Sequence, residues 1–326
     1  MNTRRKLIAA LCVVVLIAIT VVTVTVVNRK SPPATDANGK TSWASGVFPG
    51  NGIDSASAMG FGAYRNRSVQ VAAVFPGVKT WTALADDSWY LTRYQQFSGR
   101  LSIGVPLSLQ GTSLGAVSQG AADDAFRGFA AQLKKAGRAN SDLRLGWEFN
   151  GNWMEWSAFN ASQFNGAFRR VAGLLKKLLP QATIDWNGNL GTSQAGHNVF
   201  TELYPGNDVV DVIGVDAYDQ ANAHADSSAG FIKWAAMPFG LDAWYRFAHE
   251  HGKPLSLPEW GLNAKGEGDN PEFIRGMHSW LVQRSTGIAF EAYFNWSKGT
   301  LKNSLYDPVQ MPKSSKTYAQ LWTAGS

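Results

Sequence analysis

Cysteine is almost absent from this chain of 326 residues, and the only one is Cys12. A disulfide within one chain is therefore excluded. Histidine is also scarce: the five histidines show neither ligand spacing with cysteine nor a helical His-Glu pair, so we expect no metal site. A G-x-G-x-x-G turn after an early strand is missing as well, which disfavours a dinucleotide-binding open sheet. The sequence predicts no metal and no cofactor.

A basic surface suited to nucleic acid is also missing from the main part of the chain. The net charge is +6, but residues 1–30 hold five basic residues and no acidic one. Most of the excess charge thus belongs to the N-terminus, and we expect no nucleic-acid partner.

The N-terminus carries a long apolar run. Arg4, Arg5 and Lys6 precede residues 7–27, which are all apolar or threonine. At ~1.5 Å per residue this run can cross a bilayer core of ~30 Å, and the basic cluster favours a cytoplasmic N-terminus. We interpret residues 1–30 as a signal anchor, with the remaining chain outside the cytoplasm. A cleaved signal peptide, and thus a secreted protein, is the alternative; the lack of a small-x-small cleavage site favours the anchor.

The rest of the chain divides into a short polar linker, residues 31–42, and one domain, residues 43–326. Short β-rich runs alternate there with amphipathic helical runs, a pattern that predicts an α/β fold and specifically a (β/α)8 TIM barrel. A doubly wound open sheet is the main alternative. Strands are expected at 46–48, 69–75, 101–107, 143–147, 183–186, 212–215, 255–257 and 289–294, and helices at 121–136, 162–179, 241–250 and 271–284.

Two glutamates end strand-like runs inside clusters of aromatic residues. Glu148 follows the fourth expected strand, and Glu259 follows the seventh. Apolar surroundings disfavour a charged carboxylate, so such glutamates are costly unless they are used. A barrel brings the C-terminal ends of its strands to one mouth, and two carboxyl groups there are what hydrolysis of a glycosidic bond requires.

The residues around these glutamates resemble clan A glycoside hydrolases, and among them the family 26 β-mannanases. The resemblance covers most of residues 43–326 and rests on three motifs in order. The first joins an early strand-four arginine to a glutamate, a hydrophobic residue, Asn-Gly and Trp-x-x-Trp, here with Arg144, Glu148, Asn150, Trp153 and Trp156. The others are Asp-x-x-Gly-x-Asp-x-Tyr, with Asp216 and Tyr218, and Glu-aromatic-Gly, with Glu259 and Trp260.

The resemblance implies a retaining mechanism in which Glu148 is the acid/base and Glu259 the nucleophile. It also implies an endo-acting enzyme for a polysaccharide, with β-mannan first and β-glucan, β-xylan or a cell-envelope glycan as further candidates. The family usually has histidine where Trp147 stands, a position that contacts the substrate or the catalytic pair. Besides the motif residues, we expect three tryptophans to contact the sugar: Trp147, Trp186 and Trp296.

Two alternatives remain open. A membrane-tethered barrel that binds glycan without cutting it would keep the tryptophans. A serine esterase is the remote alternative, because Gly111-Thr-Ser-Leu-Gly115 matches the G-x-S-x-G pattern and would use Ser113 with His249 or His251.

Overall fold

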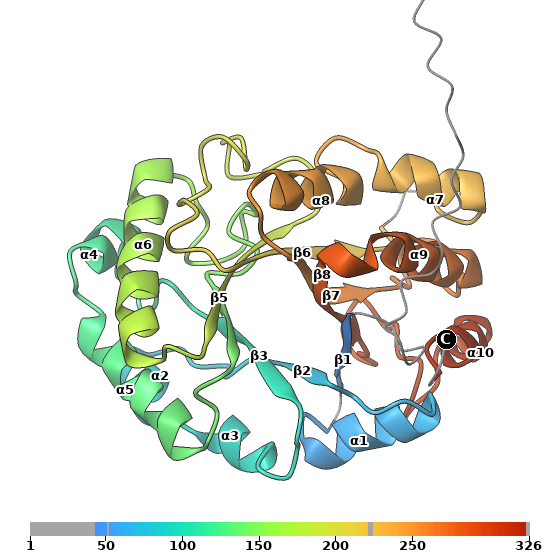
Figure 1. Cartoon of the computed structure of the whole chain (residues 1–326), viewed down its shortest axis with the longest axis horizontal. Helices are drawn as coiled ribbons and strands as arrows, with labels where there is room; N and C mark the ends of the chain where they lie inside the picture. Colours follow the sequence, from blue (N-terminus) through green and yellow to red (C-terminus); the bar gives the residue numbers. More distant parts are fainter. Residues whose placement is uncertain (1–42, 51, 221–223, 324–326) are drawn as a thin grey trace, which may run out of the picture. The chain divides into compact units, whose positions relative to one another are not determined.

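The computed structural model describes residues 43–50, 52–220 and 224–323. Eight parallel strands form a closed barrel in chain order, and β8 pairs with β1 to complete it (Figure 1). The predicted (β/α)8 barrel and its eight strands are confirmed. The strands are β1 Ala44–Phe48, β2 Val71–Val74, β3 Arg100–Val105, β4 Asp142–Leu145, β5 Thr183–Asn189, β6 Val212–Tyr218, β7 Leu255–Gly261 and β8 Ile288–Phe294.

Helices surround the barrel and follow most of the strands (Figure 1). They are α1 Ser55–Tyr64, α2 Trp81–Asp86, α3 Trp89–Arg93, α4 Leu114–Ser118, α5 Asp123–Lys135, α6 Ala161–Leu178, α7 Ser228–Ala235, α8 Leu241–Glu250, α9 Pro271–Arg284 and α10 Pro312–Leu321, with a 3-10 turn η1 Ser285–Gly287 before β8. The four predicted helices are present as α5, α6, α8 and α9, with ends shifted by at most two residues.

Local sequence signals set the ends of these helices. In α5 two acidic residues occupy the first turn and two lysines the last, which complements the helix dipole. Gly137 follows at φ +69°, a conformation that glycine adopts without strain. The side chain of Asn160 caps α6 by accepting a hydrogen bond from the Gln163 N–H at 3.0 Å.

No regular helix covers β5, because residues 190–211 form turns and loops. Five aromatic residues fill this place instead. Trp186, on β5, lies 5.1 Å from the Tyr204 ring and 5.3 Å from the Trp244 ring. The Phe200 and Phe247 rings stack at 4.6 Å beside them. Large flat rings bury much apolar area per residue, so this aromatic cluster replaces the missing helix.

The barrel interior is polar on the side of β4 to β7. In its lower layer Asp142 accepts hydrogen bonds from Ser102 at 2.9 Å and from Thr183 at 2.8 Å. Asp185 accepts one from Ser256 at 2.5 Å, and its second oxygen has no partner among the described residues. Burial and the neighbouring Asp142 raise the pKa of Asp185 well above its ordinary range.

The apolar run at residues 7–27, with the predicted segments 1–30 and 31–42, lies outside the described residues. Within the described part of the chain, no helix combines the length and hydropathy that a membrane crossing needs.

We predict that Asp185→Asn removes a pH-dependent loss of stability. Because the folded pKa of Asp185 is raised, the native state holds a proton that the unfolded chain releases, so stability falls as the pH rises. The amide needs no proton, and we expect the free energy of unfolding at pH 8 to rise by ~1–3 kcal/mol. Urea unfolding at pH 5 and pH 8 measures this, with exposed Asp86→Asn as the control. An unchanged pH dependence in Asp185→Asn would contradict the prediction.

Candidate active site

Glu148 lies directly after β4 in an unusual backbone conformation. Its φ is +54°, and Gly146 two positions earlier is at +56°. The Glu148 N–H donates to the carbonyl of Asn187 at 2.8 Å, which ties the turn to β5. A non-glycine residue at positive φ costs roughly 1–3 kcal/mol and is kept where the surrounding structure determines it. The turn aims the Glu148 side chain into the mouth of the barrel.

Two donors hold the Glu148 carboxyl group. The Trp153 indole N–H donates to Oε2 at 2.8 Å, and the Asn189 amide donates to Oε1 at 2.9 Å. Enclosure and the negative charge of Glu259 nevertheless raise the pKa of Glu148 to about 7, although both donors oppose this. The side chain can therefore give up or accept a proton near neutrality.

Glu259 lies near the end of β7 and has a different environment. Arg144 Nη1 donates to Oε1 at 2.8 Å, and the Tyr218 hydroxyl donates to Oε2 at 2.8 Å. A guanidinium and a phenol each donate to one oxygen and so fix this carboxyl group in position. The barrel thus brings Glu148 and Glu259 to one mouth, as predicted from the sequence.

Asp216 and Arg144 lie beneath this pair and are fully buried. Asp216 accepts from the Asn187 amide at 3.0 Å and lies 3.8 Å from the Arg144 guanidinium. Burial and the charge of Glu259 raise the pKa of Asp216 well above its ordinary range. Burial lowers the pKa of Arg144, but the carboxylates of Glu259 and Asp216 outweigh it and raise that pKa. The one guanidinium here contacts the Glu259 carboxyl group directly, and the pKa values of Asp216 and Glu148 are raised.

Aromatic rings border the pair on the other side. The Phe75 ring lies 4.8 Å beneath the Arg144 guanidinium, and the Phe294 ring lies 5.9 Å from the Tyr218 ring. Phe48 stacks on Phe294 at 4.3 Å. Trp296 packs against this group, as predicted for an aromatic floor. None of the phenylalanines was singled out from the sequence.

Trp147 follows β4, is partly exposed and extends the group of aromatic rings at the mouth toward that strand. Its ring lies 5.5 Å from Phe75 and 4.4 Å from Trp156. A Cβ at Gly104 would come within 2.9 Å of Phe75 and 3.2 Å of Trp147, so only glycine leaves both rings this space. Trp156 is buried behind Trp147 and donates its indole N–H to the Trp147 carbonyl at 2.7 Å. Trp156 supports Trp147 and does not itself face the mouth, contrary to the prediction.

The prediction that Trp186 and Trp260 contact the sugar is wrong, because both side chains are fully buried on the outer side of the barrel. Successive side chains of a strand face opposite ways. Since Glu259 faces the mouth, Trp260 faces the helices and donates to Glu291 at 2.6 Å. Asn187 faces inward in the same way, so Trp186 belongs to the aromatic cluster.

Asn150 is buried and positions the site instead of facing a ligand. Its side chain accepts from the Asn189 N–H at 2.7 Å and donates to the Asn189 carbonyl at 2.7 Å. This pair of bonds holds Asn189, which in turn donates to Glu148. Asn189 was missed because its role depends on a loop contact between two distant segments.

A small polar pocket adjoins Trp153 on the side of Asn189. Its volume is about 190 Å³, and Thr192, Gln194 and Gln220 contribute exposed amides and a hydroxyl. The Trp153 side chain is 47% exposed and lies across Gly151, where a Cβ would come within 2.5 Å of its ring. An indole face beside amide groups suits a sugar ring.

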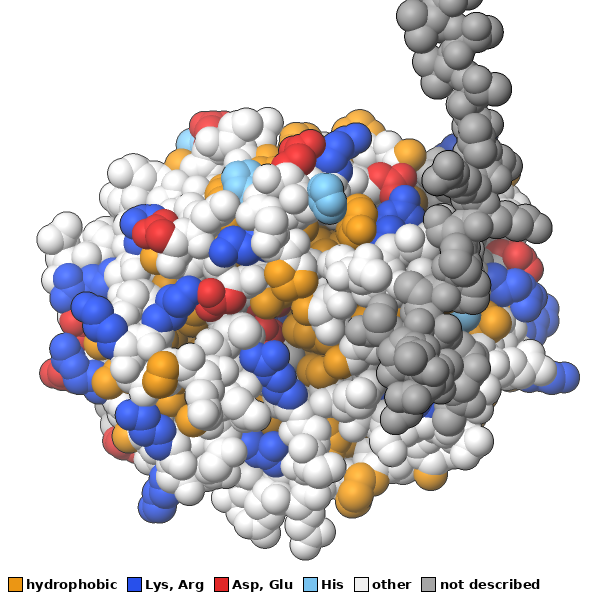
Figure 2. Space-filling view, in the orientation of Figure 1, with side chains coloured by type: hydrophobic (Ala, Val, Ile, Leu, Met, Phe, Trp, Pro, Cys, Tyr) orange, Lys and Arg blue, Asp and Glu red, His pale blue; other side chains and the backbone are white. Residues whose placement is uncertain are grey.

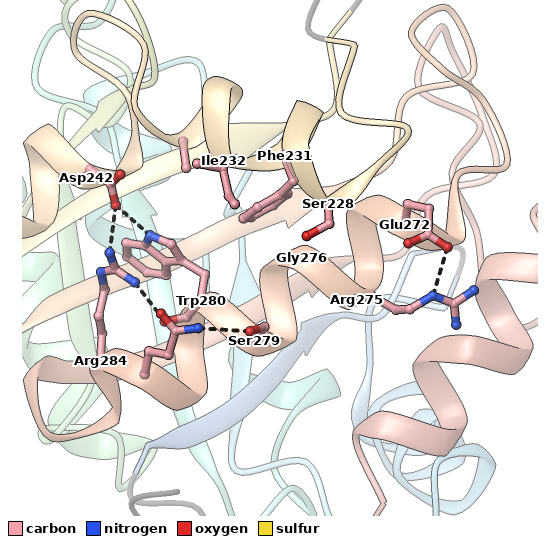
Figure 3. Close-up of a pocket in the computed structure, with 12 residues that line it drawn as sticks. Ser228, Phe231, Ile232, Asp242, Glu272, Arg275, Gly276, Ser279, Trp280 and Arg284 are labelled. Carbon is pink, nitrogen blue, oxygen red and sulfur yellow. Dashed lines mark hydrogen bonds and ion pairs between the residues drawn. The ribbon is translucent and has the colours of Figure 1, made fainter. Parts of the chain in front are cut away.

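A second groove, of about 490 Å³, lies among the outer helices between α7 and α9 (Figure 3). Its charged groups are paired: Arg275 with Glu272 at 3.0 Å and Arg284 with Asp242 at 2.9 Å. The two glutamates that the sequence singles out lie at the barrel mouth and not in this groove, so the mouth is the candidate active site. The space-filling view shows Lys and Arg mixed with Asp and Glu, and hydrophobic side chains near the centre (Figure 2).

Ser113 caps α4 by accepting from the Ala116 N–H at 3.1 Å. Among the described residues no histidine bonds the Ser113 hydroxyl, and His251 instead bonds Asn207 at 2.8 Å. The geometry gives the esterase alternative no support.

Comparison with known proteins agrees with the motifs. The model of glycosyl hydrolase family 26 matches residues 130–250, which include Arg144, Glu148 and Asp216. The chain is similar to glycoside hydrolase family 26. The predicted resemblance to this family is confirmed. The comparison with curated proteins gives no match.

Solved structures share the fold of this chain. A Cellulomonas fimi endo-beta-1,4-mannanase double mutant is 16% identical, with a TM-score of 0.56 over 77% of this chain and 63% of that chain. GH26C from Muricauda sp. is 14% identical, with a TM-score of 0.59 over 87% and 86%. A beta-mannanase from a symbiotic protist of the termite Reticulitermes speratus, complexed with gluco-manno-oligosaccharide, is 17% identical, with a TM-score of 0.52 over 86% of each chain. This chain thus spans less than two thirds of the Cellulomonas fimi protein.

We predict opposite pKa shifts of Glu148 in two variants. Glu259→Gln removes a negative charge and lowers the pKa of Glu148 below about 7. Trp153→Phe removes a donor to the charged form and raises it. Carboxyl-carbon NMR titration of the labelled protein measures both, with exposed Glu155→Gln as a control that leaves Glu148 unchanged. Shifts of the same sign in both variants would contradict this assignment.

Proposed function

We propose that this chain is a retaining glycoside hydrolase that cleaves internal β-linkages of a polysaccharide. The observation that carries the proposal is the unequal environment of two carboxyl groups at one barrel mouth. Arg144 and Tyr218 each donate to one oxygen of Glu259, whereas enclosure raises the pKa of Glu148 to about 7. Different environments for two carboxyl groups are how such enzymes assign the acid and the nucleophile.

In the first step a Glu259 oxygen attacks C1 of the sugar, and the bond from C1 to the glycosidic oxygen breaks. Glu148 gives its proton to that oxygen, so the leaving sugar departs as an alcohol. Arg144 and Tyr218 orient the attacking carboxylate, and the product is a glycosyl ester on Glu259.

In the second step Glu148 acts as a base. The ester carries no charge, so the negative charge that raised the pKa of Glu148 is gone and its carboxylate form is favoured. Trp153 and Asn189 donate to that form. Glu148 then takes a proton from water, whose oxygen attacks C1 and releases Glu259. Two inversions at C1 give net retention.

β-Mannan is the first candidate substrate, because the solved structures similar to this chain include endo-beta-1,4-mannanases. β-Glucan, β-xylan and cell-envelope glycans are the other candidates. Internal cleavage is supported by exposed rings on the loop after β4, Trp153 at 47% and Phe159 at 61%, which offer surface for sugars beyond Glu148.

We predict that the domain releases reducing ends from one polymer of a panel containing β-mannan, β-glucan, β-xylan and envelope glycans. Glu148→Gln and Glu259→Ala each lower the rate by at least ~10³-fold, and Glu155→Gln does not. Activity declines as the pH rises above about 7, because Glu148 loses its proton. Proton NMR of the first product reports its anomeric configuration.

Inversion at C1 would overturn the retaining mechanism. If folded wild type cleaved nothing and Glu148→Gln bound sugar equally well, the non-catalytic binding barrel would replace the hydrolase.

We also propose that residues 7–27 anchor the protein in the cell membrane with the barrel outside the cytoplasm. Their unbroken apolar run after three basic residues supports this. Carbonate extraction of membranes and protease access to intact cells test it. A barrel found in the growth medium without residues 1–30 would favour the cleaved signal peptide.

A further inference from the structure

The exposed charges of the barrel are distributed unevenly between its two ends. The eight strands are parallel, so all of them begin at the end opposite the mouth, here called the base, and the helices that lead into them end there. The exposed or half-buried basic residues of these helix ends and connecting segments include Arg67, Arg100, Lys134, Lys135, Lys176, Lys177, Lys253 and Arg284. Their acidic counterparts are Asp208, Asp211 and Glu250.

The loops at the mouth show the opposite balance. Exposed or half-buried acidic residues outnumber basic ones in the segments that follow the strands. The acidic residues include Asp54, Glu155, Asp226, Glu267, Asp269 and Asp307, and the basic ones include Lys79, Lys265, Lys298 and Lys302. The small net charge of the barrel thus conceals a basic base and an acidic mouth.

Hydrogen bonds between neighbouring segments fix several of the basic groups in the base. Arg100 donates to the Asn140 carbonyl at 2.8 Å and to the Thr183 hydroxyl at 2.7 Å. Lys253 donates to the Asn207 carbonyl at 2.9 Å. Carbonyl and hydroxyl groups carry no net charge, so these contacts hold the cations in place without neutralising them.

The two aspartates of the base are already paired. Asp211 bonds Lys176 at 2.5 Å, and Asp208 bonds Arg169 at 2.7 Å. Their negative charges are therefore balanced locally and do not offset the remaining basic residues.

Three exposed lysines at the ends of the neighbouring helices α5 and α6 have no ion-pair partner among the described residues: Lys134, Lys135 and Lys177. A lysine at a helix C-terminus complements the helix dipole, which accounts for each of them singly. A parallel barrel collects the helix C-termini at one end, however, and so adds their charges together on one surface.

The described chain also enters the barrel at the base. Trp43 directly precedes β1, and the Arg67 guanidinium donates to its carbonyl at 3.4 Å. Residues 31–42 separate Trp43 from the segment that carries the proposed anchor, and a chain of this length spans ~40 Å at most when extended. The base is thus the end of the barrel that this connection keeps nearest to the membrane.

We propose that the base of the barrel is a docking surface for anionic phospholipids, with the mouth facing away from the membrane. Each lysine or arginine close to such a surface strengthens binding roughly five-fold, and the acidic mouth is repelled by it. This goes beyond the proposed hydrolysis and relies on the proposed anchor only to bring the barrel to the membrane. In this orientation a polymer can cross the mouth without meeting the bilayer, as internal cleavage requires.

The first experiment uses the barrel without residues 1–42, because the eight strands and their core lie within residues 43–323. Its cosedimentation is measured with vesicles of phosphatidylcholine alone and with about one third phosphatidylglycerol. We expect binding only to the anionic vesicles, weakened about 10-fold when the salt rises from about 0.05 M to about 0.3 M.

Two triple variants with the same change in net charge locate the surface. Replacing Lys134, Lys135 and Lys177 by glutamine weakens binding about 10- to 100-fold and leaves reducing-end release in solution unchanged. The matched control replaces three exposed lysines of the mouth loops, Lys79, Lys265 and Lys302, by glutamine and leaves the affinity for vesicles unchanged.

A second experiment measures orientation in the full chain. Cys12 is the only cysteine, so Cys12→Ser allows one fluorophore to be placed by Gln181→Cys at the base or by Thr300→Cys at the mouth, both exposed positions. In vesicles whose headgroups carry a quencher, we expect quenching of the fluorophore at position 181 and little at position 300.

The outcomes separate this proposal from the hydrolase. Cleavage of polysaccharide without binding to anionic vesicles would overturn the docking surface and leave the hydrolase standing. Binding lost only in the base variant, without any cleavage by wild type, would uphold the surface and overturn the hydrolase. Equal weakening in both triple variants, equal quenching at both positions, or tighter binding to duplex DNA than to the vesicles would overturn the docking surface.

Discussion

The guanidinium of Arg144 is the point on which the barrel mouth depends. It is fully buried, bonds Glu259 and Asn187, and lies 3.8 Å from Asp216. Its Nε and Nη2 have no hydrogen-bond partner among the described residues, and the face of Phe75 covers it at 4.8 Å. A buried charge is tolerated only with such compensation. Removing Glu259, Asp216 or Phe75 would therefore leave the Arg144 charge less compensated and change its interactions with the two residues that remain.

This single cation also explains why the carboxyl groups differ. Several acids share one interior, and one arginine can balance one of them as a full charge. Glu259 has the direct contact, so Asp216 and Glu148 are pushed toward their neutral forms. The proposed division between nucleophile and acid thus follows from the distance of each glutamate to Arg144, and it needs no difference in residue type.

The fold was predictable because each strand is a short β-rich run and the helices carry their own end signals, such as Asn160 and Gly137. The pair of glutamates at the barrel mouth was predictable because glutamates amid aromatic residues stand out. Trp186 and Trp260 were misplaced although the alternation of side chains along a strand separates them from Asn187 and Glu259. Phe48, Phe75 and Phe294 could not be told from core phenylalanines, because only the closed barrel shows which residues reach the mouth.

The loop after β5 contains residues that pack in the aromatic cluster and, a few positions earlier, residues that line the polar pocket. Phe200 and Tyr204 cannot change without opening the aromatic cluster. Thr192 and Gln194, by contrast, point outward, while the backbone at Gln194 is held by the Asn150 carbonyl. These exposed side chains thus do not contribute to the packing of the barrel. In evolutionary terms, these two positions can change freely, and a lineage could alter the polar pocket beside Trp153 without first having to stabilise the barrel.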